Sequence, residues 1–394
     1  MVEALKDSKV EWLGKIPEDW KVERIGTLYS LRNSKVSDED YPPLSVTMQG
    51  ILPQLETVAK TDDHSNRKLV KKGDFAINSR SDRRGSCGIS DYDGSVSLIN
   101  IVLKPNAKMN PVYYNWLFHT SLFADEFYKW GHGIVDDLWT TNWQDMKNIF
   151  VTIPPLDEQK LIADFLDEKC AEIDKLSEDI QKQIDILNDY KKSVITRAVT
   201  KGLDPNAEMK DSGVQWIGKI PEKWTVIPVK YCFDIENGSD PKTDYGDTPV
   251  YGSGSKSFKK CVEFKKGPTV LLGRKGTVNI PQYVTGNYWN VDTAFNTKPK
   301  GNYDLKLFYY AACSFDYENY STQTALPSMT QSNYYNFKLP LMSQDEQEQI
   351  VTFLDDKCTE IDESINSKQG QITKLDTYKK SIIYEYVTGK KRVV

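Results

Sequence analysis

Two segments of this 394-residue chain occur twice, and this duplication constrains the fold more than any other feature of the sequence. Residues 6–22 (KDSKVEWLGKIPEDWKV) and 210–226 (KDSGVQWIGKIPEKWTV) are identical at 12 of 17 positions. Residues 157–200 and 345–388 are identical at 23 of 44 positions, beginning DEQKLIADFLDEKCAEID and DEQEQIVTFLDDKCTEID. A tryptophan-containing segment, a globular stretch and a long segment therefore appear in the same order in both halves.

The globular inserts between the repeated segments differ. Residues 27–150 and 231–338 share little beyond a Lys-Lys-Gly turn, which ends at Gly73 and Gly267, and an arginine seven residues later, Arg80 or Arg274. A repeated frame with divergent inserts favours a scaffold that presents two different recognition surfaces. The alternative is a duplication whose loops have drifted without consequence, and we rank it second.

Each long repeated segment is predicted to form one helix. Pro154 and Pro155 precede the first, Asp157 can cap it, and Gly202 follows it as a stop. Apolar residues recur at steps of three and four, the pattern of a helix that packs on another helix. The stripe consists of Ile173, Leu176, Ile180, Ile184, Leu187, Tyr190 and Val194 in the first helix, and Ile361, Ile365, Ile372, Leu375, Tyr378 and Ile382 in the second.

Packing the two helices against each other would bury both stripes, although Lys368 and Gln371 interrupt the second. The alternative is that each helix packs on its own globular domain. At 1.5 Å per residue an unbroken helix of this size would span about 66 Å, longer than a small domain needs, which favours the pair.

The net charge of −5 conceals an uneven distribution. The two long segments carry −4 and −5, so the remaining residues carry +4. An acidic helix pair repels phosphate and suits a spacer or a protein-docking surface, whereas the globular parts are the basic ones. No apolar run is long enough for a membrane span, and the N-terminus lacks the apolar region of a secretory signal. Six cysteines without a CxxC pair indicate reduced thiols in the cytoplasm and no zinc site.

The sequence contains no catalytic constellation that we would defend. Residues 213–219 have the spacing of a phosphate-binding loop, but Ile220 replaces the required Ser or Thr and no apolar strand precedes the loop. Glu158 and Lys160 could imitate part of a nuclease motif, yet the second copy has Glu348 where the lysine should be. The chain is therefore predicted to be non-catalytic and to bind no metal.

Basic residues cluster at the same place in both inserts, and this favours DNA as the ligand. Arginine can bond guanine O6 and N7 together, whereas lysine mostly meets phosphate. The candidate DNA contacts are Lys71, Lys72, Arg80, Arg83 and Arg84 in the first insert, and Lys256, Lys265, Lys266, Arg274 and Lys275 in the second. A solvated loop is the commoner explanation of any single cluster, so the duplication of the cluster carries the inference.

Each insert is predicted to be an α+β domain. Short runs such as DFAINSR, SVSLINIVL, PTVLLGR and PVYG read as strands, and residues 110–130 read as one helix. The predicted organisation is a tryptophan segment (1–26), a first domain (27–152), a central long helix (153–202), a second tryptophan segment (203–230), a second domain (231–340) and a C-terminal long helix (341–394).

These motifs resemble the DNA-specificity subunit of type I restriction–modification enzymes. The resemblance rests on the GKIPEDW and GKIPEKW boxes and on the helix starts IPPLDEQKLIADFLDEKCAEID and LPLMSQDEQEQIVTFLDDKCTEID. In the second insert, GDTPVYGSGS, LLGRKGTV and VDTAF also match. Together these segments cover nearly the whole chain.

The resemblance implies a function and a set of partners. Each insert would be a target-recognition domain that reads one half of a bipartite, gapped DNA target, and the two helices would pair as an antiparallel coiled coil. Two methyltransferase subunits would dock on the helices, with two restriction subunits as possible further members of the complex. S-adenosylmethionine, ATP and magnesium would belong to those partners. The spacer and docking positions are Ile173, Ile180, Leu187, Tyr190, Ile361, Ile372, Leu375 and Tyr378.

Two other functions remain open at this stage. One is a tandem protein-interaction scaffold without a DNA role. The other is a stand-alone endonuclease that uses Glu158 and Lys160.

Overall fold

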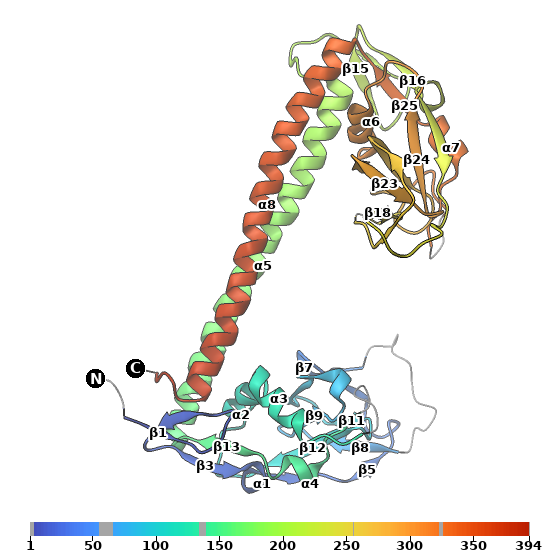
Figure 1. Cartoon of the computed structure of the whole chain (residues 1–394). Coiled ribbons are helices and arrows are strands. Elements are labelled where there is room, and N and C mark those ends of the chain that lie inside the picture. Colours follow the sequence, from blue (N-terminus) through green and yellow to red (C-terminus); the bar gives the residue numbers. More distant parts are fainter. Residues whose placement is uncertain (1–3, 55–65, 134–138, 255, 323–325, 394) are drawn as a thin grey trace. The chain divides into compact units, whose positions relative to one another are not determined.

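The chain divides into two compact units, and each unit combines segments that lie far apart in the sequence. The structure, a computed structural model, describes residues 4–54, 66–133, 139–254, 256–322 and 326–393 (Figure 1). The first unit consists of residues 1–179 and 371–394, and the second of residues 180–370. Each unit therefore holds one globular insert, the beginning of one long helix and the end of the other.

The two predicted long helices are confirmed. They are α5 (Leu156–Lys201) and α8 (Gln344–Val387). The start of α5 lies with the end of α8 in the first unit, and the end of α5 lies with the start of α8 in the second, so the helices run antiparallel (Figure 1). Gly202 follows α5 with φ +71°, a left-handed conformation that suits glycine at a helix stop. Asp157 lies within the first turn of α5 and is not its cap, because the helix begins one residue earlier.

The seam between the helices differs from the predicted stripe at three residues, two tyrosines and one leucine. Ile173, Ile180, Ile184, Ile361 and Ile382 are buried as expected, and Leu187, Ile372 and Leu375 are partly buried. Tyr190 and Tyr378, however, are 53% and 56% exposed, so their placement in the seam was wrong. Leu176 is also exposed.

A step of four residues instead of three explains the difference at the two tyrosines. After Leu187 the position that faces the partner helix is Lys191, whose Nζ lies 2.6 Å from Asp362 of α8. In the equivalent place in the first unit, Lys379 of α8 lies 2.6 Å from Asp174 of α5. A lysine thus occupies the seam at both ends, and the adjacent tyrosine points away from it.

The first insert is built on two small sheets. Four strands pair in the order β10-β9-β12-β4, and three pair in the order β11-β8-β5. The strands are β4 (Tyr29–Leu31), β5 (Lys35–Val36), β6 (Leu44–Thr47), β7 (Gly50–Pro53), β8 (Arg67–Val70), β9 (Phe75–Asn78), β10 (Cys87–Ile89), β11 (Gly94–Val96) and β12 (Asn100–Pro105). The run SVSLINIVL, read above as one strand, therefore contributes to both β11 and β12.

Three helices complete this insert. The stretch 110–130 forms two helices, α2 (Pro111–Phe118) and α3 (Ser121–Lys129), and not the single helix predicted. The reason is local, because Thr120 accepts a hydrogen bond from the Phe123 amide and so starts a new helix. The third is α4 (Trp143–Met146), and two short segments also belong to the insert, α1 (Ile25–Leu28) and the 3-10 turn η1 (Ser81–Arg83).

The four-stranded sheet of the first insert recurs in the second insert, although the sequences have diverged and the other sheets differ. Its sheets are ordered β17-β24-β21-β22 and β19-β18-β23-β20. By position along the chain, β17, β24, β21 and β22 correspond to β4, β12, β9 and β10. The strands are β17 (Phe233–Asn237), β18 (Thr248–Tyr251), β19 (Lys259–Cys261), β20 (Lys265–Lys266), β21 (Thr269–Gly273), β22 (Gln282–Val284), β23 (Asn287–Asn290) and β24 (Ala294–Pro299), with helices α6 (Leu305–Ala312) and α7 (Gln331–Asn336) and the turn η3 (Val229–Tyr231). The duplication therefore extends through the inserts.

The repeated tryptophan segments fasten each insert to the helices. Trp20 and Trp224 are almost fully buried, and their Nε1 atoms donate to Glu158 of α5 (2.9 Å) and Glu346 of α8 (3.1 Å). These segments form the strand pairs β1 (Leu5–Asp7) with β2 (Lys15–Pro17) and β14 (Met209–Asp211) with β15 (Lys219–Pro221). The strands that follow pair with the strand just before each long helix, in β3 (Lys21–Arg24) with β13 (Phe150–Ile153) and β16 (Thr225–Pro228) with β25 (Lys338–Leu341).

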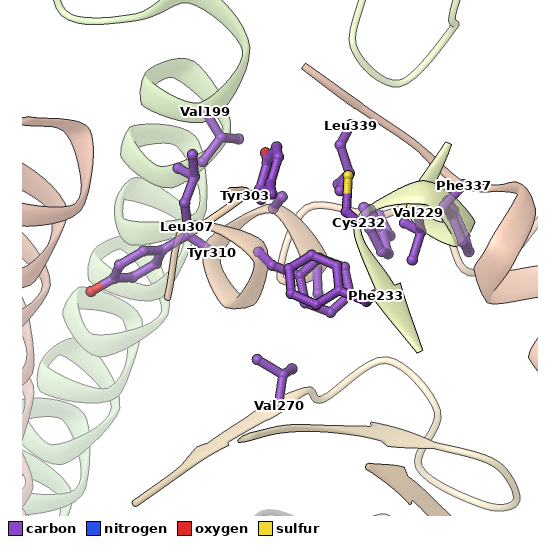
Figure 2. Close-up of a cluster of buried hydrophobic side chains, with 14 of the residues drawn as sticks. Val199, Val229, Cys232, Phe233, Val270, Tyr303, Leu307, Tyr310, Phe337 and Leu339 are labelled. Carbon is purple, nitrogen blue, oxygen red and sulfur yellow. The ribbon is translucent and has the colours of Figure 1, made fainter. Parts of the chain in front are cut away.

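The hydrophobic core of the second unit continues from the insert to the end of α5. Phe233 stacks on Phe308 of α6, with ring centroids 4.2 Å apart. Figure 2 shows Val199 of α5 beside Leu307 and Tyr310, which α6 contributes. Because this core includes residues of both the helix and the insert, the insert is fixed to the end of α5.

Candidate nucleic-acid interface

A short strand divides the basic cluster of each insert into two ends. Lys71 and Lys72 precede β9, whereas Arg80, Arg83 and Arg84 follow it. Lys265 and Lys266 lie in β20 before β21, whereas Arg274 and Lys275 follow β21. At about 3.3 Å per residue, a strand of this size separates the two ends by more than 10 Å. The residues that looked like one patch in the sequence are therefore a lysine end and an arginine end.

At the lysine end, part of the positive charge is used inside the domain. The Nζ of Lys265 donates to Asn290 and Asn296, at 2.8 Å each, and burial lowers the pKa of this lysine. Lys71 and Lys72 donate through their backbone amides to Asp74 and Asp93 and keep their side chains exposed. Lys266 is also exposed. Lys265 is the member of this group whose charge serves the fold.

The arginine end of the first insert is the turn around η1. Arg83 has a 68% exposed side chain, and its Nε lies 4.0 Å from Asp82. Arg84 pairs with Asp125 of α3, and its guanidinium lies 5.4 Å from the centre of the Tyr128 ring. Arg80 is held closer to the domain, with its Nε 3.2 Å from Asp82. The turn thus presents Arg83 and Arg84 outward.

The arginine end of the second insert is the turn after β21. Arg274 donates from Nη1 to the Asp292 carbonyl at 3.2 Å, and its side chain remains 36% exposed. Lys275 and Lys256 are exposed. The Arg274 carbonyl accepts from the Met329 amide at 2.9 Å, so the loop that precedes α7 supports the turn.

The first insert supports its arginine turn in the same way. The Ser81 amide donates to the Trp139 carbonyl at 2.9 Å, and Arg80 forms an isolated β-bridge with Thr140. Trp139 and Thr140 belong to the loop that precedes α4. Both inserts therefore carry an arginine turn at the same strand end, supported by the same neighbouring loop.

A cavity of about 630 Å³ lies beside the arginine turn of the first insert. Two asparagines that the sequence did not single out line this cavity. Asn78 of β9 and Asn100 of β12 are cross-strand partners and both are buried. Arg83 and Arg84 line the same cavity. Asparagine can bond an adenine edge through two atoms, so these amides are candidates for base contact. Strand register brings them together, and the sequence alone carries no signal of that register.

The possible nuclease pair has a structural explanation. Glu158 accepts the Trp20 indole hydrogen bond and lies 3.4 Å from Arg392. Lys160 is exposed on α5. Within the ranges that the structure describes, no group of His, Cys, Asp and Glu could hold a metal ion, and no helix could cross a membrane.

Two similar domains on one antiparallel helix pair, each with an arginine turn at the same strand end, define a duplicated recognition scaffold. Residues 17–185 and 221–382 match the family model described as the type I restriction modification DNA specificity domain. The chain belongs to this family, as the specificity subunit of a type I restriction–modification system. This is the component that directs DNA target recognition and is not itself catalytic.

Individual relatives agree with this assignment. The chain is 24% identical to a protein assigned as the MjaX type I specificity subunit of Methanocaldococcus jannaschii, over 97% of this chain and 96% of that protein. It is 28% identical to the MjaVIII specificity subunit of the same organism, over 57% of this chain and 51% of the relative. A chain of a solved type I restriction–modification system, studied for complex assembly and conformational transition, has the same fold, with a TM-score of 0.72 and 13% identity over 95% of this chain and 99% of that one.

Proposed function

We propose that each insert is a target-recognition domain and that the two domains read the two halves of a bipartite, gapped DNA target. The observation that carries this proposal is the pair of arginine turns, which occupy equivalent places in the four-stranded sheet that the two inserts share. The side chains around the two turns differ, with Asn78 and Asn100 beside one and Asp292 beside the other. The two half-sites would therefore differ, and the target need not be palindromic.

The helix pair would set the number of unread base pairs between the half-sites. A duplex presents its major groove once per turn, about every 34 Å, so two readers on one spacer can reach two separate tracts. Ile173, Ile180, Leu187, Ile361, Ile372 and Leu375 hold the pair together through burial or partial burial. In this proposal their role is to keep the spacer stiff.

The exposed tyrosines suit the docking of partner subunits. Tyr190 on α5 and Tyr378 on α8 occupy equivalent positions in the two repeats and are each more than half exposed. Two copies of one partner would meet the same local surface, which fits two methyltransferase subunits. Those subunits would bind S-adenosylmethionine and methylate adenine. Two restriction subunits that use ATP and magnesium would complete a cytoplasmic restriction complex.

Among the ten basic candidates, the exposed members of the arginine ends are the first to test. They are Arg83, Arg84, Arg274 and Lys275, together with the neighbouring Lys256. In the complex with methyltransferase subunits, Arg274→Ala should cost about 1–3 kcal/mol and relax the choice of base at one position of one half-site. Lys275→Ala is the matched control, because a phosphate contact should weaken binding on all sequences and lower the salt slope by about 0.9.

Sequencing of methylated DNA from cells with and without this chain is the readout. The proposal predicts one split motif whose two parts respond separately to changes at Arg83 and Arg274. A motif that survives charge reversal at both arginines would remove these turns from DNA recognition. The absence of any new motif in cells that also contain the methyltransferase subunit would favour a tandem protein-interaction scaffold.

A further inference from the structure

Each insert exposes a large apolar side chain in a β-hairpin, within the short turn itself in the first insert and at the end of the longer connection, where the second strand begins, in the second insert. Met48 lies between β6 and β7 and is 72% exposed. Phe258 lies directly before β19, in the connection from β18, and is 60% exposed. The two hairpins occupy the same place in the strand order, before the Lys-Lys-Gly turn of each insert. Isolated exposed apolar residues are common on proteins, but an equivalent pair in two diverged domains calls for an explanation.

In the first insert the hairpin tip lies beside the arginine turn. Met48, Arg83 and Arg84 line the cavity of about 630 Å³ described above, and Met48 and Arg84 also line a second cavity of about 340 Å³. The tip is held in shape, because the Thr47 hydroxyl donates to the Gly50 carbonyl at 2.9 Å. Gly50 has φ +106°, which only glycine adopts easily. Met48 is therefore presented on a supported turn.

In the second insert, short contacts through one loop connect Phe258 to the arginine turn. The Phe258 amide donates to the Val250 carbonyl of β18 at 3.1 Å. A Cβ placed on Gly252 would lie 3.7 Å from the Phe258 ring, and a Cβ placed on Gly276 would lie 3.5 Å from the Ser253 hydroxyl. Gly276 is two residues after Arg274, so the loop that contains Gly252 and Ser253 lies between the ring and the turn.

The cations around Met48 and Phe258 favour DNA as the surface that covers these side chains. Beside Met48 are Arg83 and Arg84, and the Lys259 ammonium lies 5.9 Å from the Phe258 ring centre. Proteins that bend DNA insert apolar wedges, among them Phe and Met, between base steps while nearby cations hold the phosphates. A protein partner would instead be expected to need acidic groups opposite these cations.

We propose that Met48 and Phe258 are apolar wedges that insert into the duplex next to the two half-sites and locally unstack it. This inference rests on the proposed DNA-reading function and adds a mechanical step to it. Each target-recognition domain would then read bases with its arginine turn and deform the adjacent base step with its exposed apolar side chain. Deformability of that step would contribute to specificity without a hydrogen bond to a base.

The experiment uses the complex with methyltransferase subunits and a duplex that carries the split motif found by sequencing of methylated DNA. Placing 2-aminopurine in turn at each step next to the half-sites reports unstacking as a rise in fluorescence. Met48→Ala should abolish the rise at one half-site and Phe258→Ala at the other. Phe258→Ala should weaken binding about tenfold or more, since stacking of one base on an aromatic ring contributes that much, and Met48→Ala should weaken binding by a smaller factor. Met48→Leu should retain the rise. The salt slope should stay unchanged, because no charge is removed.

Matched controls exist in both inserts. Tyr92 is 44% exposed in the turn between β10 and β11, at the lysine end of β9, and Phe264 is 57% exposed, six residues along the chain from Phe258. Tyr92→Ala and Phe264→Ala should leave fluorescence and affinity as in the parent complex. Circular dichroism and urea unfolding establish that each variant is folded.

Three results would overturn the inference. The first is a parent complex that binds the motif without any fluorescence rise, and the second is Met48→Ala and Phe258→Ala variants that behave like their controls. The third is a loss of subunit assembly by these variants in the absence of DNA, seen by analytical ultracentrifugation, which would make Met48 and Phe258 part of a protein-docking surface. A parent complex with no preference for the motif would instead refute the proposed function itself.

Discussion

Gln347 offers the sharpest test of how the helices hold the inserts. This side chain in the first turns of α8 is 3% exposed. Its Oε1 accepts from the Asp304 amide at 2.7 Å, and its Nε2 donates to the Met342 carbonyl at 3.3 Å. Asp304 is also the residue whose side chain caps α6. One amide group therefore joins α8, the strand end before it and the first helix of the insert.

The expected cost of Gln347→Leu follows from these two bonds. The substitution leaves a partly buried N–H and a buried carbonyl without a partner, at about 1–3 kcal/mol each. The apolar leucine returns about 1–2 kcal/mol through its burial. The net loss in the free energy of unfolding should be about 0–5 kcal/mol, with a midpoint near 2.5 kcal/mol. Gln159→Leu should cost a similar amount in the first unit, where Gln159 accepts from the Asn110 amide at 2.9 Å and donates to the Pro154 carbonyl at 2.9 Å.

Two measurements check this prediction. Urea unfolding gives the loss of stability, and hydrogen exchange resolved to single amides should show lower protection at Asp304. Gln349→Leu is the matched control, since Gln349 is exposed on the same helix two residues away. Equal unfolding midpoints for the two variants, with unchanged protection at Asp304, would show that the Gln347 amide does not join these elements.

Three further predictions follow from side chains in the cores and the seam. Burial lowers the pKa of His119 from its ordinary 6.5, so the unfolded chain takes up a proton first as the pH falls. Stability should therefore begin to drop as the pH falls through 6.5, and less so in His119→Gln, as urea midpoints would show. Trp224→Phe should cost about 0.5–1.5 kcal/mol through the lost bond to Glu346, and Trp216→Phe less, because within the described residues the Trp216 Nε1 has no partner; equal costs would contradict this. Lys379→Met should lower the free energy of unfolding by less than about 1 kcal/mol, because the ion pair with Asp174 is partly exposed. The thermal midpoint should therefore fall only slightly.

The long helices were predictable because their signals are local. Steps of three and four between apolar residues and the glycine stops at Gly202 and Gly389 depend only on neighbouring residues. The placement of Tyr190 and Tyr378 in the seam was wrong because the apolar spacing alone does not distinguish each tyrosine from the lysine that follows it. Both tyrosines and the lysines beside them satisfy the spacing, and the ion pairs to the opposite helix decide which residue enters the seam.

The inserts were less predictable because their organisation depends on contacts distant in sequence. The carbonyl of Arg274 is bonded to Met329, 55 residues later, and no local pattern indicates this. The common strand order was hidden as well, since strands preserve an alternation of buried and exposed positions and not particular residues. The division of the first basic cluster was likewise not predicted, although the strand run DFAIN stands between Lys72 and Arg80.

The most direct test of the central claim is to lengthen the spacer and read the gap. One heptad inserted after Ile180 in α5 and one after Ile372 in α8 would keep the apolar stripe and add about 10 Å. The account predicts a methylated motif with both half-sites unchanged and an unread gap about three base pairs longer, at about 3.4 Å per base pair. An unchanged gap in a folded, active complex would contradict the claim that the helix pair sets the spacing.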